Sequence, residues 1–462
     1  MLTSLRIQNF KSWGDTGTIR LAPLTVIFGA NSAGKSSLGH LLLALKQTAL
    51  SSDRRRALNL GDPTTLIDLG TFADCIHGHD VSKILDFDLE WKLPKSLEIR
   101  DAVKLKQLYS GDVLALHASL AADSKTGQPR TKSVQYRLKS GSNEVLSAEV
   151  SGVSGGKFEL TALHLTLVKA QGRAWPLEEP EKFYRLSERS IARFQNADFM
   201  ADFALETEAM LRSISYLGPL RQPPARMYQW SGDTPDDVGQ RGEHAIAAIL
   251  AAEGEKTKLN RGPRKPLMGF AEFIASWLKD LGIISSFTVR PVAEGRKEYE
   301  VLLTTQASAP EVKLTDVGFG VSQVLPALVQ AFYCPAGSTV WMEQPEIHLH
   351  PRVQAELADV FISAVQAREA GKPRHVQLIV ESHSEHFLNR LQRRIAEETI
   401  KPEDVSIYFA RRKGASTELQ PLRLNKFGDI ENWPENFFGD EMADLTARTV
   451  AAARRRQKEN SK

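Results

Sequence analysis

The amino-acid sequence predicts a mixed α/β fold in which a buried strand leads through a glycine-rich turn into a helix. Leu24 to Phe28 is a nearly unbroken apolar run, as expected of a strand covered on both faces. The run ends at Gly29, and leucines then recur at helical spacing from Leu38 to Leu45. From residue 311 onward strand-like and helix-like patterns alternate, which is typical of α/β proteins.

The other elements follow from the same periodicities. Leu5 and Ile7 alternate with polar neighbours, and Ile19 and Leu21 follow a turn, so two strands precede the buried one. We then expect strands near 84–91, 133–138, 146–150 and 158–167. Beyond them we expect helices at 185–215 and 270–281, a surface loop at 252–266 and a hairpin at 286–304. The C-terminal part predicts strands at 338–342, 375–380 and 404–409, and helices at 351–367 and 385–398.

This pattern divides the chain into three expected parts. They are an N-terminal lobe with a β subdomain (1–180), a helical and hairpin insertion (181–310) and a C-terminal lobe with a basic tail (311–462). With 462 residues, 42% of them apolar, the chain is long enough to bury a substantial core. A net charge of +3 permits contact with nucleic acid without arguing for it.

Cysteine usage and hydropathy restrict the environment. The two cysteines, Cys75 and Cys334, lie far apart, which disfavours a disulfide framework and a zinc site and favours a reducing cytoplasm. The N-terminus has no apolar h-region, and no run approaches about 18 uncharged apolar residues. We therefore expect a cytoplasmic protein without a signal peptide or a membrane span.

A phosphate-binding loop is the strongest motif. Residues 29–36 fit the pattern G-x-x-x-x-G-K-[ST], between a strand and a helix. The glycines let the backbone N–H groups converge on phosphates, Lys35 supplies charge, and the Ser36 hydroxyl can bind Mg²⁺. The expected ATP-binding residues here are Gly29, Ala30, Asn31, Ser32, Ala33, Gly34, Lys35 and Ser36.

An acidic strand end follows at 338–346. P-loop ATPases hold Mg²⁺ through a carboxylate at the tip of a strand beside the P-loop strand, and Glu343 is expected in that place. The next position usually carries the base that activates water. Here it is Gln344, which can orient a water but cannot take its proton. Glu346 is the nearest alternative carboxylate, and one of His348 and His350 is expected to be packed and the other exposed.

Two further segments could contact phosphate. Gly318 and Gly320, followed by Ser322 and Gln323, open an apolar helix and make a second helix N-terminus suited to anions. His383 follows the strand at 376–380, and ligands gather at the carboxyl ends of strands in open α/β sheets. We expect His383 to contact the γ-phosphate or the attacking water.

The order of these motifs resembles the SMC/RecF/ABC-type ATPase heads, most closely the standalone bacterial ATPases related to the OLD family. The resembling segments are LRIQNFKSW, GANSAGKSS, VGFGVSQ, TVWMEQPEIHLHP and VESHSEH. They correspond to Walker A at Gly29–Ser37, the signature at Gly318–Gln323, Walker B at Val340–Gln344, the D-loop at His348–Pro351 and the switch His383. The resemblance covers about 1–75 and 311–410, and YLGPLRQPPARMY, with Arg221 and Arg226, also resembles such proteins without an assigned role.

The resemblance implies an ABC/SMC-type ATPase head: a mixed sheet with a P-loop core, an antiparallel β subdomain and a helical lobe. It implies ATP and Mg²⁺ as cofactors, Ser37 as a further ATP ligand, and Ser36 and Glu343 as metal ligands. It also implies a head-to-tail homodimer in which Gly320, Ser322 and Gln323 of one copy close the ATP site of the other.

Departures from the family pattern decide between functions. Gln344 predicts hydrolysis that is either slow or dependent on Glu346 or on a partner. The absence of a heptad run excludes a ring-forming SMC protein, and the short C-terminal part predicts no TOPRIM nuclease. The sequence therefore favours an ATP-gated switch that controls a separate effector protein, in anti-phage defence by family analogy alone. The alternative is a RecF-like DNA-binding repair protein, with basic residues at 54–56, 255–265 and the C-terminus contacting phosphates. A transporter subunit is disfavoured by the large β-rich insert.

Overall fold

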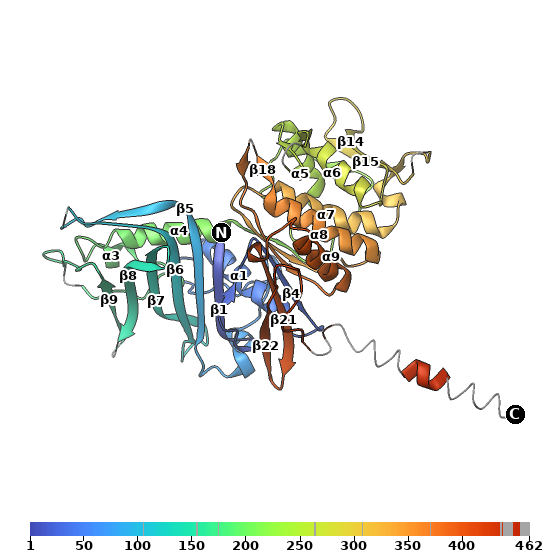
Figure 1. Ribbon diagram of the computed structural model, residues 1–462. Helices are drawn as coiled ribbons and strands as arrows, with labels where there is room; N and C mark the ends of the chain where they lie inside the picture. Colours follow the sequence, from blue (N-terminus) through green and yellow to red (C-terminus); the bar gives the residue numbers. More distant parts are fainter. Residues whose placement is uncertain are drawn as a thin grey trace.

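Two β-sheets organise the chain in the computed structural model (Figure 1). The structure describes residues 1–104, 106–153, 156–173, 175–262, 265–306, 308–369, 371–434, 437 and 447–452. The mixed α/β fold class is confirmed: one sheet is antiparallel and the other is mixed, with helices packed on it. The basic C-terminal residues 454–458 lie outside the described residues.

The antiparallel sheet forms the N-terminal β subdomain. In the strand Leu85–Arg100, the side chains of Leu85, Phe87, Leu89 and Trp91 are buried while their neighbours are at least partly exposed. A half-buried strand requires this two-residue period. Its strands are β1 (Leu2–Phe10), β2 (Trp13–Asp15), β3 (Ile19–Arg20), β5 (Leu85–Arg100), β6 (Leu108–Ala122), β7 (Pro129–Ser140), β8 (Asn143–Val153) and β9 (Lys157–Leu163). The strand β6 was not predicted, although it lies between β5 and β7.

The mixed sheet carries the P-loop. Its order is β10 (Ile214–Leu217), β17 (Thr339–Glu343), β20 (Gln377–Glu381), β4 (Leu24–Gly29), β21 (Val405–Lys413) and β22 (Ser416–Leu422). All neighbours are parallel except β21 and β22. One expectation was wrong: β17 with Glu343 is not beside the P-loop strand, because β20 lies between β17 and β4.

Helices cover both faces of this sheet. On one side α1 (Lys35–Leu50) packs with α4 (Phe199–Arg212) toward the antiparallel sheet. On the other side lie α5 (Ala245–Gly254), α6 (Phe270–Asp280), α7 (Phe319–Tyr333), α8 (Pro351–Gln366) and α9 (Glu385–Ala396). The hairpin of β14 (Ser286–Pro291) and β15 (Glu298–Thr304) extends this helical lobe, and β11 (Tyr228–Gln229) and β16 (Val312–Lys313) both pair with β15.

Short elements complete the chain and correct two expectations. They are α2 (Phe72–Cys75), α3 (Glu188–Ile191), β12 (Lys258–Leu259), β13 (Met268–Gly269), β18 (Arg368–Glu369) and β19 (Lys372–Pro373), with 3₁₀ turns at His77–His79, Leu314–Asp316 and Pro402–Asp404. The helix expected at 185–215 is two helices, α3 and α4. The expected loop at 252–266 overlaps the end of α5 and contains β12.

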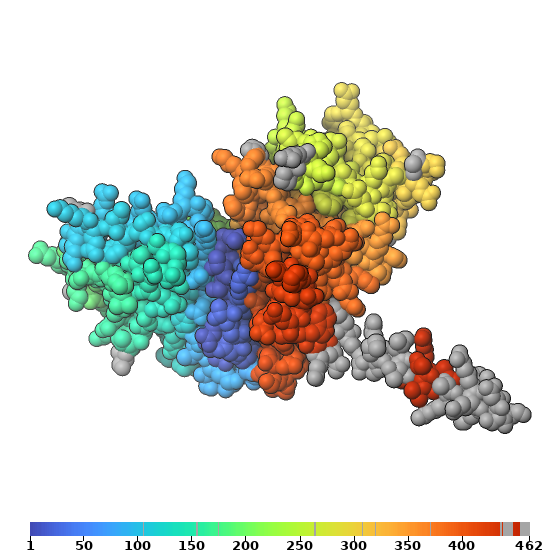
Figure 2. All heavy atoms as spheres, viewed as in Figure 1, coloured from blue at the N-terminus to red at the C-terminus, as the bar shows by residue number. Residues whose placement is uncertain are grey.

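The mixed sheet separates two hydrophobic cores. Alternate residues of β4 face opposite sides, so Ile27 joins the core under the antiparallel sheet while Val26 and Phe28 join that of the helical lobe. Gln377 ties the two sheets together: its amide nitrogen donates to the Leu2 carbonyl at 2.8 Å, and its Oε1 accepts from the Leu2 N–H at 3.1 Å. The N-terminal strand and the C-terminal strands therefore lie side by side, as Figure 2 shows.

Candidate functional site

A pocket of about 330 Å³ lies where the P-loop meets the carboxyl ends of the central strands. Ligands gather at this edge in α/β sheets. Its lining residues are Lys11, Ser12, Asn31, Ser32, Ala33, Gly34, Lys35, Ser36, Ser37, Gln344 and His383. The structure thus brings most of the predicted P-loop residues together with Gln344 and His383.

Glycine is required at two P-loop positions, because neighbouring atoms leave no room there for a side chain. Gly29 has φ 147°, and a Cβ there would lie 2.2 Å from the carbonyl oxygen of Ala410. Gly34 has φ 83°, and a Cβ there would lie 2.1 Å from Ser12 Oγ. Gly34 is also the residue before α1, and no side chain caps this helix. The Ser37 N–H donates to the Gly34 carbonyl at 3.1 Å, whereas no side chain caps the N–H groups of Lys35 and Ser36, which line the pocket as a phosphate site requires.

Lys35 is held at the base of the loop. It is only 5% exposed, and its Nζ donates to the carbonyl oxygens of Gly29 at 3.0 Å and Ala30 at 2.9 Å. Burial lowers the pKa of the Lys35 ammonium, and nearby carboxylates, Glu381 foremost, oppose this shift. Neutral carbonyls are weaker partners for an ammonium than phosphate oxygens are, so the arrangement suits a triphosphate.

Two buried glutamates end neighbouring strands beneath the loop. Glu343 and Glu381 are direct partners in the β17–β20 register. Glu343 Oε1 accepts from the Tyr216 hydroxyl at 2.9 Å and lies 3.7 Å from His40 Nε2. Burial raises the pKa of both carboxyls, and the charge of Glu343 raises that of Glu381 further. Burial lowers the pKa of His40 to about 4, so at neutral pH His40 does not balance the charge of Glu343.

Glu381 also contacts the P-loop helix. The Ser36 hydroxyl donates to its Oε2 at 2.9 Å, and the Trp341 indole N–H donates to its Oε1 at 3.0 Å. Sequence reasoning did not assign Glu381 to the site. The sequence could have indicated Glu381, because it ends the predicted strand before His383 just as Glu343 ends the strand at 338–342.

Gln344 occupies a strained position that faces the pocket. Its φ is 44°, which is uncommon for a residue other than glycine, and its N–H donates to the Glu381 carbonyl at 2.9 Å. Strain of this kind persists where the surrounding structure enforces it, often at functional sites. This hydrogen bond to the neighbouring strand fixes the backbone of Gln344 beside the pocket.

His383 lines the pocket opposite the loop. Its Nε2 is buried and has no hydrogen-bond partner among the described residues. Burial lowers the pKa of His383 to about 4, so the ring is neutral near pH 7. A buried, unpartnered ring nitrogen indicates a ligand that supplies the missing hydrogen bond, and a phosphate oxygen or a water meets that need.

Glu346 does not line the pocket. It is 6% exposed, and its Oε1 accepts from the Ser382 hydroxyl at 2.9 Å and from the His383 N–H at 2.6 Å. These contacts favour a positioning role, in which Glu346 holds the loop that carries His383. The other oxygen, Oε2, is buried and has no hydrogen-bond partner within the described residues, so the role of Glu346 as an alternative base stays a prediction.

The signature segment at 318–323 does not line this pocket. Gly318 precedes α7 and is exposed, whereas Ser322 and Gln323 are 6% and 3% exposed. Gly320, Ser322 and Gln323 are not among the residues that line the pocket. The structure does not bring these predicted ATP ligands to the P-loop of the same chain.

Several neighbouring residues were missed or misjudged. His348 and His350 are both exposed, with Leu349 buried between them, so the expectation that one would be packed was wrong.

Arg221 is 6% exposed, and its Nη2 donates to the Glu343 carbonyl at 3.4 Å. Its Nε and Nη1 have no partner within the described residues. The exposed Arg226 pairs with Asp316 at 3.1 Å.

Comparisons with known proteins agree with an ATPase. Residues 249–388 match a family described as "AAA ATPase domain", and residues 400–447 match one described as "Protein of unknown function (DUF3696)". No curated protein matches the chain. Within the described part of the chain, no helix is both long and apolar enough to cross a bilayer.

Solved structures of SMC heads are distantly similar. A SmcHead bound to the C-winged helix domain of ScpA is 12% identical, with TM-score 0.43 and coverage of 92% of this chain and 98% of that one. The SMC head domain from Thermotoga maritima is 11% identical, with TM-score 0.38 and coverage of 91% and 99%. The Smc head with an extended coiled coil bound to the C-terminal domain of ScpA from Pyrococcus furiosus is 11% identical, with TM-score 0.40 and coverage of 92% and 96%.

Proposed function

We propose that this chain, an ABC/SMC-like P-loop ATPase, is an ATP-gated switch that pairs head to tail with a second copy and controls a separate effector protein. The observation that supports pairing is that the two predicted phosphate-binding segments do not line the same pocket. The P-loop pocket is lined by Asn31–Ser37, Gln344 and His383, while Gly318–Gln323 lies outside its lining. A partner's exposed Gly318 turn would then close the γ-phosphate side.

The resident residues suit a magnesium nucleotide. Uncapped N–H groups at the start of α1, Lys35 and the unpartnered His383 Nε2 fit phosphate oxygens, and Ser36 with Glu343 would hold Mg²⁺. When bound, the metal would neutralise negative charge on the β- and γ-phosphates. Gln344 would orient the attacking water without taking its proton, so we propose that hydrolysis is slow.

ATP would act as the link between the two copies, and its loss would release them. A ligand that contacts both subunits stabilises the paired state by its differential affinity for that state. A slow hydrolytic step makes the paired state long-lived, which suits a switch better than a motor. By its resemblance to OLD-related ATPases, we assign the effector to anti-phage defence.

We expect Gly318→Glu to abolish ATP-dependent dimers while leaving ATP affinity within about twofold. Gly318 is exposed, and a Cβ there meets no heavy atom within 4 Å, so the fold accepts a side chain. The added carboxylate would repel the partner's triphosphate. Multi-angle light scattering with and without a non-hydrolysable ATP analogue measures the effect.

The matched control for this variant is Leu205→Glu, which adds the same charge at a position on α4 that is 63% exposed. This control should dimerise as the wild type does. Undiminished ATP-dependent dimerisation of Gly318→Glu would remove the support for head-to-tail pairing. Ser322 is a poorer choice for substitution because it is buried.

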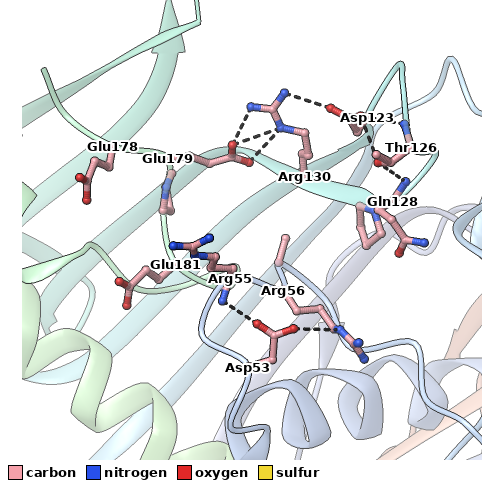
Figure 3. Close-up of a pocket in the computed structure, with 13 residues that line it drawn as sticks. Asp53, Arg55, Arg56, Asp123, Thr126, Gln128, Arg130, Glu178, Glu179 and Glu181 are labelled. Atoms are coloured by element: carbon pink, nitrogen blue, oxygen red, sulfur yellow. Dashed lines mark hydrogen bonds and ion pairs between the residues drawn. The ribbon is translucent and has the colours of Figure 1, made fainter.

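Two of the basic residues that suggested the RecF-like alternative, Arg56 and Arg261, are paired with acids. Arg56 lies 3.6 Å from Asp53, and Arg130 is bound by Asp123 and Glu179, in a cleft of about 810 Å³ that also contains Glu178 and Glu181 (Figure 3). In the loop that follows α5, Arg261 pairs with Asp280 and stacks on Trp277. Arginines already paired with acids are poor phosphate ligands.

Gel shifts with duplex DNA at several salt concentrations test this alternative. We expect weak binding that ATP does not strengthen, because the acids of the cleft repel the DNA backbone. The wild type with and without ATP is the comparison. Tight ATP-dependent binding with a steep salt dependence would instead favour a DNA clamp.

A further inference from the structure

We infer that the magnesium site contains a second carboxylate: Glu381 orients the Ser36 hydroxyl and shares the cation with Glu343. The inference rests on the proposed binding of a magnesium nucleotide and adds a residue that the Walker motifs do not include. It assigns to the chain three oxygen ligands for one hard divalent cation, with nucleotide phosphates completing the shell. Mg²⁺ is commonly bound by one or two carboxylates together with substrate phosphates.

Strand order brings Glu381 to the loop. The strand beside β4 is β20, not β17, and Glu381 is its last residue. In the parallel register Glu381 pairs with Glu343 on one side and with Ile27, two residues before the P-loop, on the other. Glu381 therefore lies between the Walker B strand and the P-loop strand, at the edge where the phosphates would bind.

The hydrogen bond between Ser36 and Glu381 runs in the direction that leaves the Ser36 oxygen available to a metal ion. A serine hydroxyl has one hydrogen and two lone pairs, and it can offer a lone pair to Mg²⁺ while its hydrogen is accepted elsewhere. Glu381 Oε2 accepts that hydrogen at 2.9 Å. The carboxylate thus turns the Ser36 oxygen so that its lone pairs are available to a cation.

Glu381 is itself held in place. Its other oxygen accepts from the Trp341 indole at 3.0 Å, and Trp341 is only 1% exposed. The indole fits against α1 because Gly39 has no side chain; a Cβ there would lie 2.4 Å from the ring. A carboxylate fixed by a buried indole and a P-loop hydroxyl is a pre-organised ligand, and such outer contacts tune metal affinity.

The two carboxylates lack a protein cation that pairs with them. Glu343 and Glu381 are 6% and 1% exposed, and no Lys or Arg nitrogen forms an ion pair with either among the described residues. Lys35 donates to backbone carbonyls instead, and Arg221 donates to the backbone carbonyl of Glu343. Buried carboxylates are normally paired with a cation or coordinate a metal, and hard oxygen ligands suit Mg²⁺, Ca²⁺ or Mn²⁺.

Metal affinity measured apart from turnover tests the inference. We expect Glu381→Gln to weaken Mn²⁺ binding by tenfold or more, because the amide removes one negative charge and can donate to Ser36 instead of accepting from it. Mn²⁺ is titrated into the full-length protein with a non-hydrolysable ATP analogue, and free Mn²⁺ is read by electron paramagnetic resonance. Affinity for the nucleotide in EDTA should stay within about twofold.

Two further variants sharpen the result. Trp341→Phe removes the indole N–H and leaves the carboxylate, so it should weaken Mn²⁺ binding less than Glu381→Gln does. Glu403→Gln makes the same chemical change at an exposed carboxylate and should leave Mn²⁺ affinity unchanged. Should Glu381→Gln fail to fold by circular dichroism, Glu381→Asp retains the charge, withdraws it from Ser36 and should show the same loss.

The outcomes separate this inference from the proposed function. If Glu381→Gln, or Glu381→Asp in its place, binds Mn²⁺ as tightly as the wild type while the wild type binds the nucleotide, the second carboxylate is refuted and the ATPase proposal stands. If the wild type binds no adenine nucleotide with or without metal, the proposed function itself fails. A loss of Mn²⁺ affinity in the Glu381 variants but not in Glu403→Gln supports the inference.

Discussion

Replacing Lys35 with alanine is expected to lower ATP affinity by about 100-fold or more. A hydrogen bond to a charged group contributes roughly 1.5–3 kcal/mol, and about 1.4 kcal/mol corresponds to a factor of ten. Lys35 is the basic residue at the base of the loop and would contact more than one phosphate oxygen. Isothermal titration calorimetry with ATP and Mg²⁺ measures the effect.

The control for Lys35→Ala is Lys401→Ala, which removes an ammonium group that is 75% exposed. This variant should bind ATP as the wild type does. Because Lys35 is buried, thermal melting must show that Lys35→Ala is folded before its affinity is interpreted. A folded Lys35→Ala protein with unchanged ATP affinity would contradict the assignment of the pocket.

Replacing Gln344 with glutamate is expected to raise ATP turnover by about tenfold or more. A positioned general base commonly contributes 10²–10⁴-fold, and the amide of Gln344 cannot take a proton. The substitution is nearly isosteric and tolerates the local φ of 44° about as well as glutamine does. Steady-state phosphate release at saturating ATP measures turnover.

The pH dependence distinguishes a new base from a change of packing. The rate of Gln344→Glu should fall more steeply at acid pH than the wild-type rate, because the introduced carboxylate is protonated in addition to the buried Glu343 and Glu381 that both proteins share. Gln344→Ala should lower turnover below the wild type, because it removes the group that orients water. An unaltered rate in Gln344→Glu would mean that another residue serves as the base, and Glu346→Gln would then examine the nearest carboxylate.

Elements with a strong local pattern were predicted well. The apolar run before Gly29 became β4, and the helix and hairpin expected at 270–281 and 286–304 became α6 and the β14–β15 pair. The strand β6 was missed because Ala115, Ala118 and Ala121 blur its alternation of apolar and polar residues. Its place is set by pairing with β5 and β7, which is a long-range property.

In the candidate site, too, the local motif was predicted from the sequence and the contacts between distant segments were not. Residues 29–37 form a contiguous motif whose glycines and helix N-terminus act locally, so the sequence was enough to predict a phosphate loop there. The position of Glu343 at a strand end was also predicted. Its neighbours Tyr216, His40 and Glu381 come from distant segments, and no local pattern links them.

The sequence by itself determined that a buried strand, a glycine-rich loop and a helix form a phosphate cradle, because backbone conformation and helix polarity depend on adjacent residues. Only the tertiary structure decided which strand lies beside the cradle. Inserting β20 between β4 and β17 places Glu381 against Ser36, although 345 positions separate them in the chain. Strand order is settled by which faces bury the most apolar surface across the whole sheet, and no single segment encodes that choice.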